Sequence, residues 1–154
     1  MGSYQNHALE GASAVDLVVA LYDGIIRFLN TAANAVDCGD QDSRRAAVKR
    51  ALDIIIHLQA RLRMDIGGRP ALALSEFYAA IFAQIMQASQ SASRQKFEHV
   101  IDCVRDVRDA WKQVAHDVSL AEADNSFGLP QGSQSGHFAS EPDFDSSSSS
   151  HWNA

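Results

Sequence analysis

The chain has 154 residues, of which 46% are apolar, and its 13 basic and 19 acidic side chains give a formal net charge of -6. This size and apolar content fit one globular domain. Two cysteines are too few for a small secreted fold held together by disulfides, so a reducing, cytoplasmic compartment is expected. The chain has no run of about 18 apolar residues, and its start lacks the basic and apolar regions of an export signal, so we expect no membrane insertion.

The negative charge is concentrated at the C-terminal end. Residues 119–154 contain five acidic side chains and no lysine or arginine, and they therefore hold -5 of the net -6. Ten serines with scattered glycines and prolines leave this segment too little apolar surface to offset the entropy of ordering, which predicts a disordered, acidic tail. Residues 1–118 carry 14 acidic and 13 basic side chains, and this near-neutral balance argues against a nucleic-acid partner.

The first predicted helix covers residues 14–37 and follows an N-terminal arm at residues 1–12. Ser13 and Asp16 resemble a helix-capping pair, and apolar side chains then recur every three or four residues. Gly24 lies inside this helix, where glycine costs about 1 kcal/mol relative to alanine. A packing reason is therefore expected: either a bulky core side chain or the backbone of a neighbouring helix or bound peptide comes close to it.

Three further helices are predicted downstream. Gly39 and the polar residues after it supply a stop for the first helix and a cap for the second. Pro70 suits the first turn of the third helix, where its missing amide hydrogen costs nothing. The fourth keeps helical spacing without a proline or glycine. The predicted helices cover residues 43–66, 71–91 and 94–118. Short connections between such helices predict an all-α, antiparallel up-down four-helix bundle at residues 13–118.

The first two helices carry more apolar side chains than a bundle seam needs. The additional ones are Leu17, Val19, Ile26, Ile54 and Ile56. Such faces need a cover, and there are four candidates: the N-terminal arm, the aromatic residues of the tail, a second copy of the chain, or a foreign partner. The sequence alone does not choose among them.

Residue patterns typical of catalysis or metal binding are mostly absent. The Glu-x-x-His pair of di-iron bundles does not occur. Asp53 and His57 are one helical turn apart, which favours a structural hydrogen bond over half of a metal site. No Gly-x-Ser-x-Gly turn is present, and nothing near Cys38 or Cys103 would activate a thiolate. We therefore expect no enzyme, no metal and no cofactor.

A histidine phosphotransfer bundle is the alternative from the signalling class. Such a domain presents an exposed helical histidine with a lysine nearby and a glycine that lets a response regulator approach. The residues that follow His57 and His99 do not supply this pattern. This interpretation is kept as the alternative to a binding protein.

Four segments, taken in order, carry a resemblance to a known family. They are Leu-Val-Val-Ala-Leu-Tyr-Asp-Gly at residues 17–24, the Gly67-Gly68 pair, Leu-Ser-Glu-Phe-Tyr at residues 74–78 and Ala-Trp-Lys at residues 110–112. Over about residues 4–118 the chain resembles the FliS family of flagellin-specific export chaperones. It departs from the family where Ala14 replaces a frequent proline, where Arg69 and Pro70 replace a more typical acidic residue, and in its longer serine-rich tail.

The resemblance implies a cytoplasmic four-helix chaperone without catalysis, nucleotide or cofactor. Its client would be the disordered C-terminal segment of flagellin, which it would keep from premature polymerisation and deliver to the flagellar type III export apparatus. An amphipathic client helix would also cover the excess apolar faces of the first two helices. The excess apolar faces and the family resemblance therefore indicate the same client-binding surface on the first two helices.

The candidate client-binding residues combine the resemblance with the apolar pattern. Tyrosine suits a groove edge because its phenol needs a polar partner when buried, whereas ordinary core packing is an equal alternative for the aliphatic candidates. The candidates are Tyr4, Tyr22, Ile25, Ile55, Ile56, Leu62 and Tyr78.

Overall fold

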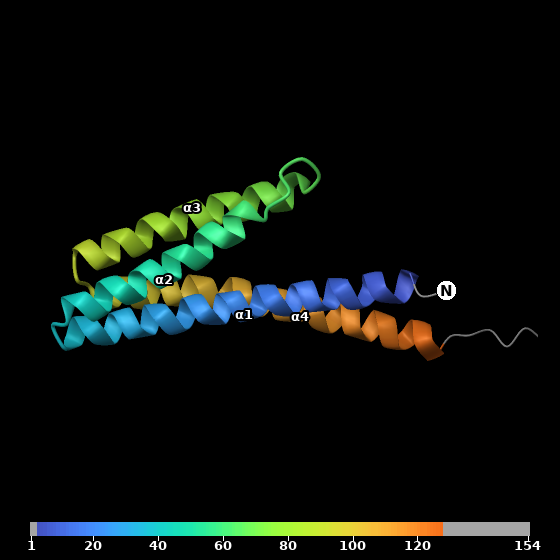
Figure 1. Ribbon diagram of the computed structural model, residues 1–154, viewed down its shortest axis with the longest axis horizontal. Helices are drawn as coiled ribbons and strands as arrows, with labels where there is room; N and C mark the ends of the chain where they lie inside the picture. Colours follow the sequence, from blue (N-terminus) through green and yellow to red (C-terminus); the bar gives the residue numbers. More distant parts are fainter. Residues whose placement is uncertain (1–2, 128–154) are drawn as a thin grey trace, which may run out of the picture.

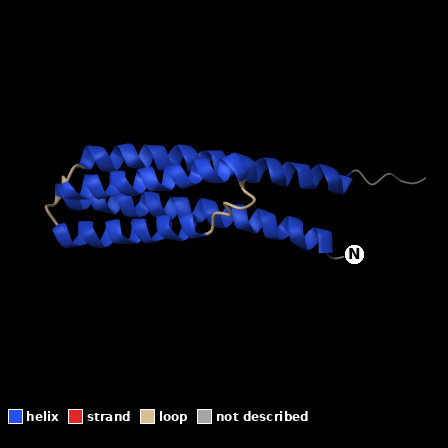
Figure 2. Ribbon diagram, turned by 90° about the horizontal axis from the view of Figure 1, so that it is seen from above, coloured by secondary structure: helices blue, strands red, loops and turns tan. Residues whose placement is uncertain are grey.

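The computed structural model describes residues 3–127, and it describes side chains from Ala14 to Asp124. Within this part of the chain all regular structure is helical (Figure 2). The four helices are α1 (Ser3–Asp37), α2 (Gln41–Ala60), α3 (Gly68–Gln90) and α4 (Arg94–Phe127). The predicted all-α four-helix fold is confirmed.

The helices form a bundle that is closed at one end and open at the other. α1 packs against both α2 and α4, and α3 packs against both α2 and α4. At the closed end, the α1–α2 and α3–α4 connections lie together (Figure 1). Toward the other end the α2–α3 hairpin diverges from the α1–α4 pair, and α1 and α4 extend beyond the α2–α3 connection. We call this the open end.

A glycine turn joins α1 to α2 at the closed end. Gly39 has a positive φ of 66°, and the Asp40 amide bonds back to the Ala35 carbonyl at 2.9 Å. This arrangement ends a helix and satisfies one of its last carbonyl groups. The Asp40 carboxylate then accepts a hydrogen bond from the Ser43 amide at 3.0 Å, which caps α2. The stop and the cap expected at this point are confirmed.

The α3–α4 connection uses the same turn geometry with an alanine in place of the glycine. Ala92 has a positive φ of 45°, and the Ser93 amide bonds back to the Ala88 carbonyl at 3.1 Å. The Ser93 hydroxyl accepts a hydrogen bond from the Lys96 amide at 3.3 Å and caps α4. A left-handed backbone costs a residue with a side chain about 1–2 kcal/mol, so this turn is held by its surroundings.

α2 ends at Ala60, whereas the sequence pattern placed its end at residue 66. The Arg61 amide bonds to the Leu58 carbonyl three residues back at 3.2 Å, which tightens the last turn. The chain then folds so closely that a Cβ on Gly67 would lie 2.5 Å from the Arg63 carbonyl oxygen. A glycine is therefore required at this turn, and the next residue begins α3.

The outer ends of α1 and α4 also differ from the expected bounds. α1 begins at Ser3, so its backbone includes residues 3–12 of the N-terminal arm that was expected at 1–12. α4 continues to Phe127, nine residues past its expected end, because no glycine or proline interrupts the chain before Gly128. Residues 119–127 were expected to belong to the disordered tail and are helical instead, whereas the rest of that tail, residues 128–154, lies outside the described part of the chain.

The core is made of apolar side chains from all four helices. Among the described residues every buried side chain is apolar, apart from the hydroxyl groups of two tyrosines. Burying one large aliphatic or aromatic side chain contributes roughly 1.5–3 kcal/mol. The largest fully buried side chains are Tyr22, Ile25, Leu29, Ile55, Ile81, Ile85, Phe97, Val100 and Val104.

Gly24 marks a close approach of α2 to α1. A Cβ at this buried position would lie 3.1 Å from Cδ1 of Ile54 on α2. Of the two interpretations of Gly24, the structure therefore supports close contact with a bulky side chain, that of the partly buried Ile54.

α3 is the one helix in the described part of the chain that is long and apolar enough to cross a membrane, judged by length and composition. Core helices of water-soluble proteins pass the same test. In this fold α3 packs its apolar stripe against α2 and α4, and it places Tyr78, Ile81, Ile85 and Ala88 in the core. These four side chains are thus used inside the bundle, whereas Leu72 and Met86 of the same helix are exposed.

Candidate functional site

An apolar cleft lies where the two helix pairs diverge. It has a volume of about 560 Å³ and receives side chains from all four helices. We call it the open-end cleft. Its apolar lining is Ala14, Leu17, Val18 and Leu21 of α1, Leu58, Ala60 and Leu62 at the end of α2 and after it, Leu74 and Tyr78 of α3, and Trp111 of α4; Arg61 and Arg63 complete it.

A second apolar cleft runs between α2 and α3. It has a volume of about 380 Å³. Its lining is apolar except for Gln59 and the phenol of Tyr78. We call it the α2–α3 groove. Its lining is Ile55, Ile56, Gln59, Ala60, Tyr78, Ala79 and Phe82. Because Ala60 and Tyr78 line both cavities, the two form one interrupted apolar surface.

A pair of buried phenols lies beneath this surface. The hydroxyl oxygens of Tyr22 on α1 and Tyr78 on α3 are 2.8 Å apart and share a hydrogen bond. Burial, and next the bond to Tyr78, raise the pKa of Tyr22, and burial raises the pKa of Tyr78. Both phenols therefore stay neutral at physiological pH. Their bond connects α1 to α3 across the bundle and satisfies two polar groups that would otherwise be stranded.

Large apolar side chains remain exposed along the two cavities. Leu17 in the open-end cleft is 46% exposed and Ile56 in the α2–α3 groove is 55% exposed. Beyond them, Met64, Ile66 and Leu72 are exposed around the α2–α3 connection. Apolar side chains gathered on one face of a protein mark an interaction surface. The surplus predicted on the first two helices is therefore uncovered at Leu17 and Ile56 in this structure.

Two other residues of the predicted surplus are covered by the bundle itself, whereas Val19 is only half-buried. Ile26 is buried, and Ile54 is partly buried against the core near Gly24. The helical pattern treats Ile54 and Ile56 alike, but only the second faces a cavity. Which apolar side chains need a partner is thus decided by how the helices pack.

The structure separates the seven predicted binding residues into groups. Tyr22 and Ile25 are fully buried and line neither cavity. Ile55 and Tyr78 are buried yet contribute to cavity walls, whereas Ile56 and Leu62 are more accessible lining residues. Tyr4 lies in the first turns of α1, and its side chain is outside the described part.

Sequence reasoning missed several residues that line the cavities. Among them are Leu21, Leu74, Phe82 and Trp111. A signal was available for three of them, because they stand inside the segments that carry the family resemblance, whereas Phe82 had only its helical spacing. The segments that carry the family resemblance therefore contribute more of the cavity lining than the apolar stripe alone indicates.

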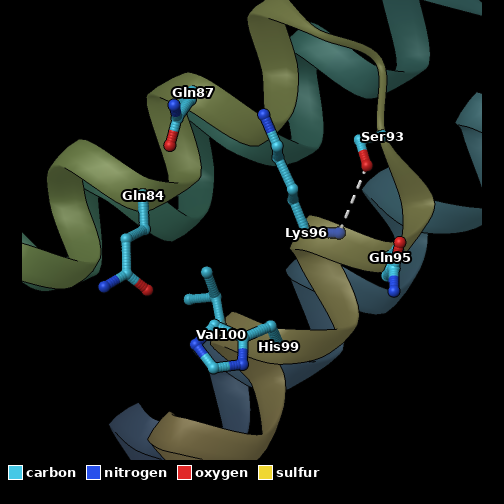
Figure 3. Close-up of a pocket in the computed structure, with 7 residues that line it drawn as sticks. All are labelled: Gln84, Gln87, Ser93, Gln95, Lys96, His99 and Val100. Atoms are coloured by element: carbon cyan, nitrogen blue, oxygen red, sulfur yellow. Dashed lines mark hydrogen bonds between the residues drawn. The ribbon is translucent and has the colours of Figure 1, made fainter.

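A polar groove lies between α3 and α4 near the closed end. Its volume is about 520 Å³, and its lining is Gln84, Gln87, Ser93, Gln95, Lys96, His99 and Val100 (Figure 3). His99 is exposed, and the Lys96 side chain extends away from the imidazole ring. The imidazole lies 3.9 Å from the Cys103 sulfur. This arrangement adds no support for a phosphotransfer histidine.

The other candidate polar residues make surface contacts. Asp53 pairs with Lys49 at 3.4 Å, one turn before it on α2, and His57 is exposed. Within the described residues, no three histidine, cysteine, aspartate or glutamate side chains come close enough to hold a metal ion. The apolar cavities are therefore the surface with the clearest binding chemistry.

Comparison with known proteins gives a consistent result. The family model described as "Flagellar protein FliS" matches residues 1–118. The chain is 32% identical over 117 residues to the flagellar secretion chaperone FliS of Vibrio cholerae, covering 74% of this chain and 86% of that protein. It is 31% identical over 117 residues to the chaperone of the same name from Salmonella typhimurium, covering 75% and 87%. The Bacillus subtilis chaperone is 27% identical over 111 residues, covering 72% and 82%.

Proposed function

The chain belongs to the FliS family of flagellar proteins, and from its paired apolar cavities we propose that it is a cytoplasmic export chaperone for flagellin. It binds the disordered C-terminal segment of flagellin and prevents that segment from polymerising prematurely. It then delivers the client to the flagellar type III export apparatus. The proposal assigns no catalytic step, metal or cofactor to the protein.

The observation that carries this proposal is the pair of apolar cavities that share Ala60 and Tyr78 in their walls. The open-end cleft and the α2–α3 groove meet there, and each exposes a large aliphatic side chain, Leu17 in one and Ile56 in the other. An amphipathic segment that becomes helical on binding places apolar side chains every three or four residues, which suits cavities that follow helix axes. One client segment could therefore fill both cavities.

The energetics favour a long, distributed contact over a few strong ones. A disordered segment loses several kcal/mol of conformational freedom when it folds on a partner. Apolar burial contributes about 25 cal/mol per Å², so many weak contacts along both cavities can offset this loss. Release at the export apparatus then requires no chemical step, and the apolar contacts between flagellin and the two cavities should themselves depend little on salt.

Calorimetry with a peptide copied from about the last 40 residues of the cognate flagellin tests the proposal. We expect a one-to-one complex with a negative heat-capacity change, the mark of apolar burial. No binding at high micromolar concentration would exclude the proposed function.

Ile56→Asp tests whether the α2–α3 groove is used. Because Ile56 is already 55% exposed, the substitution should leave helical content and cooperative melting intact. It should weaken peptide binding by about tenfold or more, since apolar contact is lost and a carboxylate is desolvated.

His57→Asp is the matched control. His57 is exposed on the same helix at the next position and lines neither cavity. It introduces the same carboxylate, so the peptide affinity should stay within about twofold of the parent value. Equal affinities of the two variants would show that the client does not occupy the α2–α3 groove.

A further inference from the structure

The open end brings the outgoing chain close to the open-end cleft. The end of α4, the start of α1 and the α2–α3 connection all lie at this end of the molecule (Figure 1). The chain therefore leaves α4 on the side where the cleft opens. The family match ends at residue 118, so the last 36 residues lie beyond the part shared with the family.

The rim of the open-end cleft is basic. Arg61 and Arg63 line the cleft, and Arg69 follows in the first turn of α3. Arg63 is held by Asp65 through two hydrogen bonds of 3.1 and 2.9 Å. Arg61 is exposed and makes no ion pair with another described residue. The floor of the cleft is apolar and its edge carries excess positive charge. A segment with both apolar and acidic side chains would therefore complement it.

The C-terminal segment, residues 128–154, has this composition. It contains no lysine or arginine, and its acidic residues stand among aromatic ones, with one phenylalanine directly between two aspartates. The acidic residues are Glu141, Asp143 and Asp145, and the aromatic ones are Phe138, Phe144 and Trp152. Each aromatic side chain that enters a cavity removes about 150–250 Å² of surface from water. The segment therefore matches the cleft in charge and in apolar content.

The distance between the segment and the cleft is short. Trp111 in the cleft wall precedes Phe127 by 16 residues of α4, which is about 24 Å along a helix. The 17 residues from Phe127 to Phe144 can span up to about 60 Å when extended. The segment can thus return along α4 with slack, and such a tether gives an effective concentration on the order of millimolar.

We propose that the C-terminal segment docks its aromatic residues into the open-end cleft when no client is bound. Phe144 with its flanking aspartates is the central contact, because it can place a ring on the apolar floor and carboxylates near Arg61. The docked segment keeps the exposed apolar surface around Leu17 covered until a client displaces it. Only this last consequence, competition with flagellin, rests on the proposed function.

Competition lowers the apparent affinity for the client by a predictable factor. If the untethered segment bound with a dissociation constant of about 0.1 mM, an effective concentration near 1 mM would reduce client affinity about tenfold. Because carboxylate to arginine contacts hold the segment in part, added salt should weaken its docking. Client affinity of the full chain should therefore rise with salt.

Methyl NMR of the full chain without any client tests docking directly. The test variant combines Phe138→Ser, Phe144→Ser and Trp152→Ser, and the matched control combines Ser146→Ala, Ser148→Ala and Ser150→Ala in the same segment. Docked rings shift nearby methyl resonances, so the aromatic variant should change those of Leu17, Leu62 and Leu74. The serine control should leave them at their parent positions, and Leu29 in the core should stay unchanged in both.

Two spectral outcomes would overturn docking. Identical cleft methyl resonances in the parent chain and the aromatic variant would show that the segment is elsewhere. Cleft resonances that move with protein concentration, and equally in both variants, would show that a second copy of the chain covers the cleft instead.

Peptide calorimetry on the same full-length variants separates the two proposals. The aromatic variant should bind the flagellin peptide about tenfold more tightly than the parent chain, and the serine control should not. Equal affinities would overturn the competition. If no protein binds the peptide while the methyl shifts differ as expected, docking stands and the proposed function fails.

Discussion

Replacing one phenol of the Tyr22–Tyr78 pair with phenylalanine should destabilise the protein more than replacing both. The two hydroxyl oxygens are 2.8 Å apart, and the residues are 0% and 2% exposed. A buried hydroxyl without its partner loses hydrogen bonding that water would have provided. Removing both hydroxyl groups leaves two apolar rings and no stranded polar group.

The two single substitutions should differ in size. Tyr78→Phe strands the hydroxyl of Tyr22, which is fully buried, and should cost about 1–3 kcal/mol in the free energy of unfolding. Tyr78 lines both cavities, so in Tyr22→Phe its hydroxyl can turn toward water, and the cost should be about 0.5–1 kcal/mol. The double substitution should lie nearer to the parent than Tyr78→Phe does, which corresponds to a coupling energy of about 1–2 kcal/mol.

Urea unfolding followed by circular dichroism gives the four free energies of this cycle. With unchanged slopes, each kcal/mol should also move the melting temperature by roughly 3–6 °C for a domain of this size. If the changes in the free energy of unfolding of the two single variants sum to that of the double variant within about 0.5 kcal/mol, the two hydroxyl groups act independently. The account of a satisfied buried pair would then be wrong.

Two further predictions concern the closed-end turn and alkaline pH. Ala92→Gly should stabilise the fold by about 0.5–1 kcal/mol in urea unfolding, because glycine adopts the positive φ of 45° without strain; a loss of stability would contradict the assigned turn. The raised pKa values of Tyr22 and Tyr78 mean that the unfolded chain ionises first, near pH 10. The contribution of these phenols to the free energy of unfolding is fully present below that pH and should be lost above it, by up to about 1.4 kcal/mol per pH unit for each phenol. If the double variant Tyr22→Phe/Tyr78→Phe lost stability equally steeply above about pH 10, this explanation would be wrong.

Local signals were sufficient to place the helices. The apolar spacing, the glycine at position 39 and Pro70 in the first turn of α3 all act within a few residues, so they can be read without knowing the fold. The bounds were less certain where no such signal exists. α2 stops at Ala60 because the connection folds back on itself through the Arg63 carbonyl and Gly67, a contact that helical spacing does not encode.

The candidate site was harder to predict because core and cavity positions have the same composition. Ile55 and Ile56 are neighbours of identical chemistry, yet their exposed fractions are 2% and 55%. Tyr22 was expected at a groove edge because its phenol needs a polar partner, but that partner is Tyr78 inside the bundle. Its role in client binding stays a prediction, as does that of the other candidates.

The sequence by itself determined that this protein is a four-helix chain with an acidic C-terminal segment, and its ordered motifs pointed to the FliS family. The tertiary structure decided where the apolar surplus is exposed. Divergence of the α2–α3 hairpin from the α1–α4 pair leaves Leu17 uncovered, and the groove between α2 and α3 leaves Ile56 uncovered, while Ile26 is buried. The physical reason is that a helical stripe fixes which side chains share a face, whereas their burial depends on the distance to the next helix.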